Sequence, residues 1–543
     1  MSALSRIVGR LAKLPPARVR EVAVERDLEA TMPDGTVLLA DRWYPKTPGR
    51  PPVIVLRSPY GRRQLGLVGR LFAERGYQAI IQSCRGTFGS GGDWEPFRHE
   101  REDGRATLAW VAAQPWSDGS MATFGPSYLG LTQWALVDDP PPGLRAMAPA
   151  VTATDFGPAV VSPGGAFALE SNLTWLNQVE HQETGGARRL LAMARGGAVV
   201  RRAAMTLPLG DTDQRAVGHR VGWFQDWMAH EEADDPWWDP IDFGRHLGDA
   251  PPATLVGGWY DLFLPWQVAD YQTLQAAGRT ARLTIGPWTH ASRAGMAAAM
   301  RDGLDWFDTH LGGWPPARQA AVRLFVMGSR RWVDLSVWPP PADTERWHLH
   351  AGGRLDPAPA AASRPDRYRY DPTDPTPGVG GAALNGKSAG AQDQRAREER
   401  PDVLTYTSDA MVEDMTVAGP LAVQLWVRSS LDYTDLFVRL CDVSPEGRST
   451  NLADGFIRLG SGDIDRGADG SFHVRVAMSP TANTFRVNHR VRLQVSSGAH
   501  PLLARNPGTG EPLATAVTLR PADQEVLHDP DHPSAIELPI SRI

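Results

Sequence analysis

The chain has 543 residues, of which 42% are hydrophobic and 22% are charged, and its formal net charge is −6. This length predicts several domains, and the small net charge argues against nucleic acid or an anionic membrane surface as a partner. The only two cysteines, Cys84 and Cys441, form neither a disulfide framework nor a metal-ligand spacing, so we expect two buried thiols.

The N-terminal segment has no apolar stretch of signal-peptide length, and the chain has no run of about 18 apolar residues. The sequence therefore predicts a cytoplasmic protein that does not associate with a membrane.

Residues 1–150 alternate short apolar strands with helices. A hairpin is predicted at 33–35, where proline, aspartate and glycine interrupt two alternating segments. Buried strands are predicted over 53–56, 77–83 and 121–125, and helices over about 67–75 and 101–113. Apolar strands that alternate with helices are typical of a mostly parallel sheet covered on both faces, so this segment is interpreted as the first part of an α/β core.

Residues 151–240 show no strand alternation and are interpreted as a helical insertion, or cap. Several tryptophans lie in this segment: Trp175, Trp223, Trp227, Trp237 and Trp238. The strand-then-loop pattern returns at 253–261 and 281–290, so residues 241–317 are interpreted as the second part of the same α/β core.

Beyond residue 317 the chain contains many short alternating segments separated by proline, glycine and aspartate turns. Residues 318–543, starting with the apolar segment at 322–328, are therefore predicted to form an antiparallel β-sandwich of jelly-roll type. The stretch 371–396 is a long polar connection rich in proline and glycine.

The sequence FGPSYLG at 124–130 places Ser127 between a predicted strand and a predicted helix. This is the context of a nucleophile elbow, a sharp turn that exposes a serine hydroxyl above the carboxyl edge of a sheet. Gly125 supplies the small residue that the turn needs two positions before the serine. The second glycine is Gly130 instead of residue 129, so this stretch taken alone fits an ordinary turn equally well.

Asp261 and His290 each follow a predicted strand, in the order serine, aspartate, histidine that α/β-hydrolases use. The carboxyl ends of parallel strands meet at one edge of a sheet, so we expect the three side chains to lie close together. This pattern predicts Ser127 as nucleophile, His290 as general base and Asp261 as the carboxylate that orients the imidazole.

Attack on a carbonyl also needs donors for the developing oxyanion. The backbone N–H of Tyr128 is the expected first donor. Tyr60, in the loop after an earlier strand, offers a hydroxyl as the second, although spacing alone favours a half-buried structural tyrosine. Trp259, Phe263 and Trp288 flank the predicted triad and are candidates to line the substrate pocket or simply to pack in the core.

The motifs RSPYG, CRGTFGSGG, GPSYLG, GGWYDLF and GPWTH, together with FDTHL, YDPTDP, DGFIRL and RNPGTGE further on, resemble the CocE/NonD serine hydrolases in order along nearly the whole chain. This family includes bacterial cocaine esterase, α-amino-acid ester hydrolases and X-Pro dipeptidyl peptidases. Its elbow is written G-x-S-Y-x-G, so Gly130 stands where the family places its glycine. The resemblance implies a triad of Ser127, Asp261 and His290, an oxyanion hole of Tyr60 and Tyr128, and self-association.

The expected function is hydrolysis of small-molecule carboxylic esters without a cofactor or metal. Amide or peptide cleavage, as by an X-Pro dipeptidyl peptidase or a β-lactam acylase, is the alternative within the hydrolases. It is less favoured because LFLPWQVAD, after Asp261, places no acid nearby to bind an α-amino group. A non-catalytic ligand-binding protein is the alternative from another class.

Overall fold

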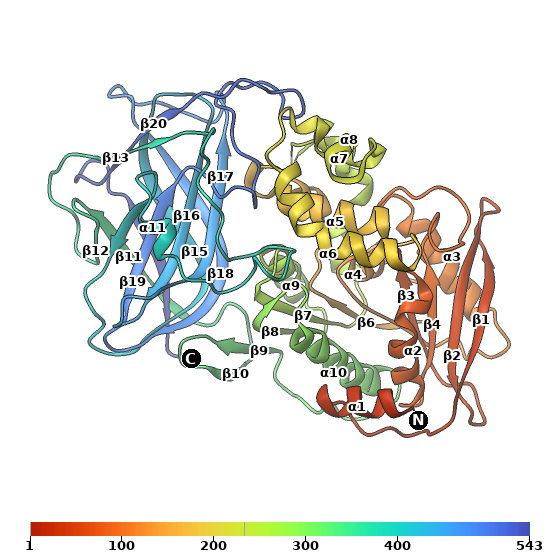
Figure 1. Cartoon of the computed structure of the whole chain (residues 1–543). Helices are drawn as coiled ribbons and strands as arrows, with labels where there is room; N and C mark the ends of the chain where they lie inside the picture. The colour runs from red at the N-terminus through yellow and green to blue at the C-terminus, as the bar shows by residue number, and fades with distance from the viewer. Residues whose placement is uncertain (1, 233) are drawn as a thin grey trace.

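The computed structural model describes residues 2–232 and 234–543, apart from the side chains of 187–191 and 193. An α/β domain and a β-rich domain form its two lobes, and the helices α5 (Leu169–His181) to α8 (Gly222–Ala229) lie where the lobes meet (Figure 1).

The sheet of the α/β domain has the strand order β1-β2-β4-β3-β5-β6-β7-β8-β9-β10. Its strands are β1 (Val22–Thr31), β2 (Val37–Pro45), β3 (Val53–Ser58), β4 (Gln78–Ser83), β5 (Met121–Pro126), β6 (Leu144–Ala150), β7 (Ala253–Tyr260), β8 (Ala281–Thr289), β9 (Val322–Val326) and β10 (Arg331–Leu335). Neighbouring strands from β4 to β9 run parallel, whereas β1, β2 and β10 are antiparallel to their neighbours. The predicted hairpin is the connection between β1 and β2.

Helices cover both faces of this sheet. One face packs against α2 (Gly66–Ala73) and α10 (Arg293–His310), and α1 (Ala3–Leu11) lies on α2; the other face packs against α3 (Glu100–Ala112), α4 (Tyr128–Trp134) and α9 (Leu264–Ala276). Successive side chains of a strand point to opposite faces, so in β3 Ile54 joins the core around Phe72 while Val55 joins the core around Leu108. The predicted α/β fold class is confirmed.

The segment 151–240 is helical. It contains α5, α6 (Gly186–Ala203), α7 (Thr212–Val217) and α8, with short helical turns between them, and no named strand among its described residues. Its two ends meet in an isolated antiparallel bridge between Asp155 and Asp242.

The prediction for residues 322–328 is wrong. This segment was assigned to the β-sandwich, but β9 pairs in parallel with β8 and extends the sheet of the α/β domain, and β10 continues that sheet. A short apolar strand can have the same sequence pattern in a parallel sheet and in an antiparallel sandwich, because the pattern does not indicate the direction of the neighbouring strand.

Residues beyond β10 form the β-rich domain, as predicted. Its strands are β11 (Ala342–His350), β12 (Arg354–Asp356), β13 (Asp366–Tyr370), β14 (Leu404–Thr407), β15 (Met415–Ser429), β16 (Thr434–Val443), β17 (Ser449–Leu459), β18 (Phe472–Phe485), β19 (Arg490–Ser496), β20 (Ala522–Leu527) and β21 (Ala535–Ser541), with the short helix α11 (Arg395–Glu398). All pairings are antiparallel except that of β12 with β14. Because β21 pairs with both β11 and β15, the sheet folds back on itself into a sandwich.

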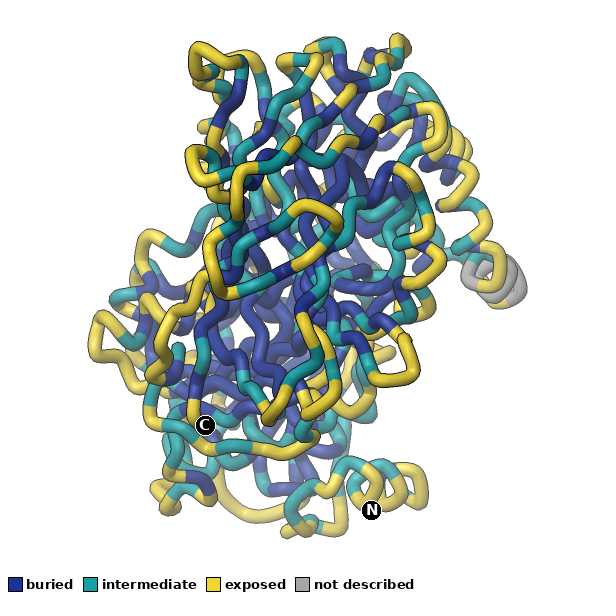
Figure 2. The backbone as a smooth tube through the Cα atoms, turned by 90° about the vertical axis from the view of Figure 1, so that its left-hand side faces the viewer, coloured by how far each residue is buried: buried dark blue, intermediate teal, exposed yellow. Residues whose placement is uncertain are grey.

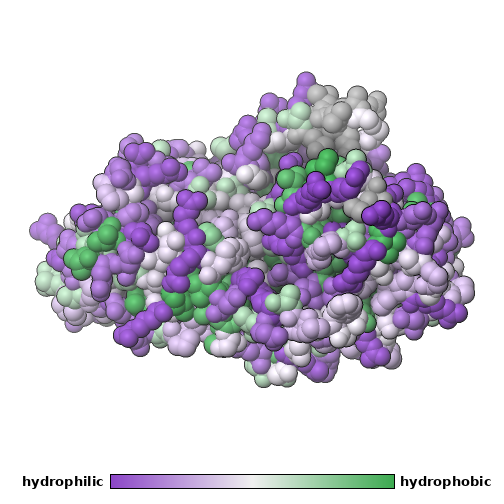
Figure 3. Space-filling model, turned by 90° about the horizontal axis from the view of Figure 1, so that it is seen from below, coloured by the Kyte–Doolittle hydropathy of each residue, from purple (hydrophilic) through white to green (hydrophobic). Residues whose placement is uncertain are grey.

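Buried residues run through the interior of the molecule and exposed residues gather in the loops (Figure 2). Cys84 and Cys441 are buried free thiols, as expected. The face in Figure 3 is mostly hydrophilic, with hydrophobic residues in separate patches. In the part of the chain that the structure describes, no helix combines the length and the apolar character needed to cross a membrane.

Buried carboxyl groups lie where the helical insertion joins the α/β domain. Asp270 of α9 accepts hydrogen bonds from the backbone N–H and the hydroxyl of Thr154, at 3.1 and 2.7 Å. Burial raises the pKa of Asp270 to about 7. Burial also raises the pKa of Asp155 to about 7, and the nearby Asp242 carboxylate adds to this shift. The junction therefore favours protonated carboxyls.

A raised pKa in the folded state makes stability fall as the pH rises. The contribution of Asp270 is fully present below its unfolded pKa of about 4 and is lost as the pH rises through about 7. In Asp270→Asn, the midpoint of denaturant unfolding should therefore decrease less between about pH 4 and pH 7 than in the wild type. Asp465→Asn, at an exposed position, is the matched control and should keep the wild-type pH dependence. Equal pH dependence in Asp270→Asn and the wild type would contradict this account.

Candidate active site

Ser127 occupies the sharp turn between β5 and α4. Its backbone has φ 57° and ψ −126°, a conformation that non-glycine residues seldom adopt and that costs about 1–3 kcal/mol. Hydrogen bonds hold the turn, from the Ser127 N–H to the Ala150 carbonyl at 2.8 Å and from the Gly130 N–H to the Ser127 carbonyl at 2.7 Å. A serine kept in such a geometry at a strand end has its side chain directed away from the sheet, as in a nucleophile elbow.

The two glycines of FGPSYLG are required by packing. A Cβ atom at Gly125 would lie 2.3 Å from the Leu129 Cβ, and one at Gly130 would lie 2.4 Å from the Thr152 Cγ2. The late glycine therefore allows the first turn of α4 to pass close to the segment that follows β6. A glycine at position 130 is therefore compatible with a nucleophile elbow.

Asp261 and His290 follow β7 and β8 and are joined by a hydrogen bond. The distance from His290 Nδ1 to Asp261 Oδ2 is 2.8 Å, and the Phe263 N–H donates to Asp261 Oδ1 at 2.8 Å. Asp261 is buried, so its carboxylate is held in one position. With Nδ1 donating to the carboxylate, Nε2 of His290 is left to accept a proton.

Tyr60 lies beyond the end of β3, and its hydroxyl reaches the same region. It accepts a hydrogen bond from Trp175 Nε1 at 3.0 Å, and Tyr60 and Ser127 line the same cavity. Burial raises the pKa of Tyr60 to about 12, against the opposing effect of the hydrogen bond from Trp175. The phenol therefore keeps its proton at neutral pH and can donate it in a hydrogen bond.

The side chain of Tyr128 is anchored beneath the turn by a buried network. Its hydroxyl donates to Glu100 Oε1 at 2.8 Å and accepts from the Phe97 N–H at 3.0 Å. Glu100 Oε2 in turn pairs with Arg57 at 2.8 Å, and both side chains are almost fully buried. Burial, followed by the Glu100 charge, raises the pKa of Tyr128 well above its usual value. This network fixes the backbone next to Ser127.

A small cavity of about 40 Å³ is lined by Ser127, His290 and Tyr60, together with other residues. It is lined by Tyr60, Phe97, Ser127, Tyr128, Phe156, Val160, Ser171, Trp175, Trp227, Leu262, Phe263, His290 and Leu384. The α/β core supplies Ser127, His290 and the two tyrosines, the helical insertion supplies Ser171 and part of the apolar wall, and Leu384 comes from the connection at 371–396. The cavity is therefore assembled from three separate parts of the chain.

Of the three predicted pocket residues, the structure brings only Phe263 to this cavity. Trp259 instead donates from Nε1 to the Phe325 carbonyl at 2.7 Å, next to β9. Trp288 packs in a separate core with Val151 and Val256 and contacts Trp332. Neither tryptophan is among the described residues that line the cavity, so for both the packing interpretation holds.

Several residues that line the site were not predicted from the sequence. Trp175 binds the Tyr60 hydroxyl, and the rings of Trp175 and Trp227 are parallel to within 7° with centroids 5.6 Å apart. Phe97 and Phe156 complete this aromatic wall, with centroids 4.7 Å apart. The available signal was the number of tryptophans in the insertion, but their sequence positions did not indicate which ones face the serine.

Known proteins resemble the whole chain. The family model described as X-Pro dipeptidyl-peptidase (S15 family) matches residues 34–292, and that of the X-Pro dipeptidyl-peptidase C-terminal non-catalytic domain matches residues 313–537. The cocaine esterase of Rhodococcus sp. (strain MB1 Bresler) is 32% identical, across 95% of this chain and 98% of that protein.

Solved structures share the fold over the same extent. An α-amino acid ester hydrolase and the aminopeptidase of the marine sediment archaeon Thaumarchaeota archaeon each superpose with a TM-score of 0.82 at 23% identity. Each covers 97% of this chain and is itself covered to 98%.

A parallel-rich sheet with a serine turn after β5 and an aspartate–histidine pair after β7 and β8 defines the class of α/β-hydrolases. Within that class the chain belongs to the S15 family of esterases and peptidases, in its CocE/NonD group. The family resemblance drawn from the motifs is thus confirmed.

Proposed function

We propose that the protein hydrolyses carboxylic esters through an acyl-enzyme on Ser127, with His290 as general base and Asp261 as its orienting carboxylate. The observation that carries this proposal is that Ser127 and His290 line one cavity, while the His290 imidazole is fixed by the buried Asp261 at 2.8 Å. A nucleophile, a base and a group that orients the base are the three parts that acyl transfer requires.

In the first half of the reaction, Ser127 Oγ attacks the ester carbonyl carbon and His290 Nε2 takes its proton. The bond to the alcohol oxygen then breaks, and Nε2 gives this proton to the departing alcohol. In the second half, water attacks the acyl carbon and passes a proton to Nε2. The bond to Oγ breaks, the carboxylic acid leaves and Oγ recovers its proton. Asp261 stabilises the imidazolium that forms in each half.

The oxyanion is held by the Tyr60 hydroxyl and the Tyr128 backbone N–H. Tyr60 and Ser127 line the same cavity, and burial keeps the Tyr60 hydroxyl protonated at neutral pH by raising its pKa. A substrate carbonyl oxygen in this cavity would accept a hydrogen bond from the Tyr60 hydroxyl, while the Ser127 hydroxyl would give its proton to His290. Such donors act strongly because they are already oriented and shielded from water.

The cavity favours a short, uncharged acyl group. Its volume of about 40 Å³ leaves room for only a few heavy atoms, and its described lining residues include no aspartate or glutamate. A free α-ammonium group would have to lose its water here without a carboxylate partner, which is costly. These observations support an esterase over a dipeptidyl peptidase.

Ser127→Ala should lower kcat by about 10⁵–10⁶-fold, because the triad then has no nucleophile. The activity is measured on p-nitrophenyl acetate, with Ser461→Ala, on the exposed surface of the sandwich, as the matched control. A fluorophosphonate probe should label the wild type and not Ser127→Ala. The mechanism would be overturned if Ser127→Ala kept more than a tenth of the wild-type activity. It would also be overturned if the probe did not label the wild type, which is the result expected of a non-catalytic binding protein.

Tyr60→Phe and Tyr128→Phe remove the same hydroxyl from two positions with different proposed roles. Tyr60→Phe should lower kcat by about 10²–10³-fold, because one oxyanion donor is lost. Tyr128→Phe keeps the backbone donor but leaves the buried Phe97 N–H unpaired, so it should destabilise the protein by about 1–3 kcal/mol and keep kcat within about tenfold. Steady-state kinetics and denaturant unfolding measure the two effects. The proposed oxyanion hole would be contradicted if Tyr128→Phe lost the catalytic rate and Tyr60→Phe lost only stability.

The choice between ester and amide is tested by comparing p-nitrophenyl esters of increasing acyl length with Ala-Pro-p-nitroanilide. We expect kcat/KM to be highest for short acyl esters and lower for the anilide, because the cavity offers no partner for the α-ammonium group. A higher kcat/KM for the anilide than for every ester would instead favour peptide cleavage.

A further inference from the structure

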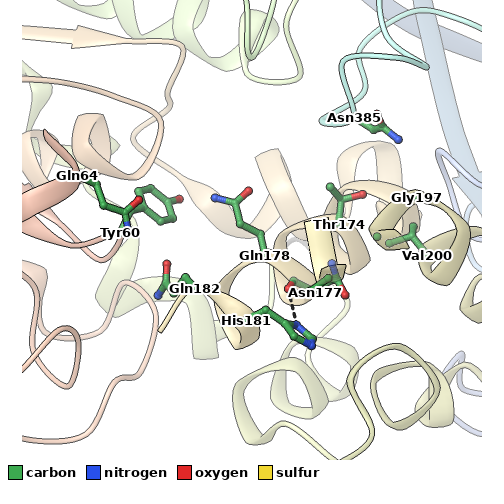
Figure 4. Close-up of a pocket in the computed structure, with 12 residues that line it drawn as sticks. Tyr60, Gln64, Thr174, Asn177, Gln178, His181, Gln182, Gly197, Val200 and Asn385 are labelled. Atoms are coloured by element: carbon green, nitrogen blue, oxygen red, sulfur yellow. Dashed lines mark hydrogen bonds between the residues drawn. The ribbon is translucent and has the colours of Figure 1, made fainter. Parts of the chain in front are cut away.

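A second, larger cavity adjoins the first on the other side of Tyr60. It measures about 380 Å³ and is lined by Tyr60, Gln64, Thr174, Asn177, Gln178, His181, Gln182, Ala192, Gly196, Gly197, Val200 and Asn385 (Figure 4). Tyr60 lines both cavities. Thr174 and Asn385 line the larger one while their neighbours Trp175 and Leu384 line the smaller one, so the two cavities share a wall.

One face of α5 supplies most of this wall. The positions 174, 177, 178, 181 and 182 follow the spacing that places residues on one side of a helix, and all five are polar and uncharged or histidine. The opposite side buries Leu169, Leu173, Leu176 and Val179. On this face Gln178 is exposed and Gln182 is buried, so the polar side chains line a cavity that is open to solvent and extends to Tyr60.

Several hydrogen-bonding groups in the cavity have no partner in the described protein. Gln182 is 8% exposed; its Nε2 donates to the Pro59 carbonyl at 3.1 Å, and its buried Oε1 is unpaired. The Gln178 side chain is exposed, and its amide, which has no hydrogen bond within the described protein, is directed from α5 toward Tyr60 (Figure 4). His181 Nδ1 donates to the Asn177 carbonyl at 2.9 Å, which leaves Nε2 as an acceptor. A buried unpaired acceptor such as Gln182 Oε1 is costly and calls for a ligand donor.

Two adjacent glycines in α6 keep the cavity open. Gly196 and Gly197 lie inside the helix, where each costs about 1 kcal/mol relative to alanine. A Cβ at Gly196 would lie 3.0 Å from Asn177 Nδ2, and one at Gly197 would lie 3.6 Å from Arg201 Nη1 and 3.7 Å from Asn385 Nδ2. Any larger side chain at 197 would occupy the space between α6 and Asn385.

The geometry points to a substrate subsite for an uncharged hydrogen-bonding group, such as a carboxamide, attached to the ester that Ser127 cleaves. The described lining residues provide amide donors and acceptors and include no aspartate, glutamate, lysine or arginine. A ligand with both a donor and an acceptor satisfies them, whereas an alkyl chain leaves them unpaired. This inference rests on the proposed esterase function and adds that the preferred substrates carry an amide-like group on the acyl or the alcohol part.

The test compares two substrate pairs of equal chain length. On the acyl side they are p-nitrophenyl γ-acetamidobutyrate and p-nitrophenyl heptanoate, and on the alcohol side acetamidobutyl acetate and heptyl acetate, followed by acid release. The measured quantity is the ratio of kcat/KM for the amide-bearing ester over the alkyl ester, which is internal to each variant. We expect the wild type to favour the amide-bearing ester in one pair, and that pair identifies which part of the substrate enters the cavity.

Gln178→Leu should lower this ratio by about threefold to tenfold, the worth of a neutral hydrogen bond. Gly197→Leu, which fills the cavity and favours the helix, should lower kcat/KM for both long esters of that pair relative to p-nitrophenyl acetate. Gln214→Leu, at an exposed position of α7, is the matched control and should leave all values at the wild-type level.

The outcomes separate the subsite from the esterase function. If the wild type hydrolyses p-nitrophenyl acetate but shows no preference in either pair, the subsite is overturned and the esterase function stands. The same holds if Gln178→Leu keeps the wild-type ratio and Gly197→Leu keeps the wild-type kcat/KM for the long esters relative to p-nitrophenyl acetate. If the wild type does not hydrolyse p-nitrophenyl acetate or any of the four esters, both proposals fail together.

Discussion

The backbone turn at Ser127 is the constraint on which the rest of the site depends. A serine with φ 57° and ψ −126° persists only where the surrounding structure fixes it. Here the fixing groups are the hydrogen bond to Ala150, the two glycines that allow Leu129 and Thr152 to approach, and the Tyr128–Glu100–Arg57 network below. The same network sets the direction of the Tyr128 N–H, so the nucleophile and one oxyanion donor share their support.

A parallel sheet brings the other polar groups to this turn, but it leaves them open to water. Closure comes from the helical insertion, whose Trp175 reaches the Tyr60 hydroxyl, and from the connection at 371–396, which contributes Leu384 and Asn385. The Ser388 hydroxyl of this connection also lies 3.5 Å from Glu170 in α5. The β-rich domain thus takes part in the site through one connecting segment, and a change in that segment acts directly on the cavity walls.

The sequence predicted those features that depend on local pattern. Strand ends at Ser127, Asp261 and His290 could be placed because each follows an apolar run, and chain order then limited their roles. Side-chain direction was not predictable in the same way: Trp259 and Trp288 flank the triad in sequence, but Trp259 donates to the Phe325 carbonyl and Trp288 packs in a separate core. Long-range pairing was also missed, since nothing local distinguishes β9 in the α/β sheet from a sandwich strand. The support of Tyr128 by Glu100 and Arg57 depends on three elements far apart in the chain.

The two cavities differ in the chemistry of their lining residues, so each is suited to a different part of a substrate. Around Ser127 the walls are aromatic and aliphatic, so a charged group gains nothing there to offset its lost hydration. Beyond Tyr60 the lining includes several side-chain amides. Such amides distinguish substrates weakly by charge, but they strongly disfavour a substituent that leaves their donors and acceptors without hydrogen bonds. A family that contains both peptidases and esterases can share one nucleophile turn, because the difference between an ammonium and an uncharged substituent is decided by the walls of the cavities. In this chain the described lining residues of both cavities include no aspartate or glutamate, and the proposed preference for esters over substrates with a free amino terminus rests on that lining.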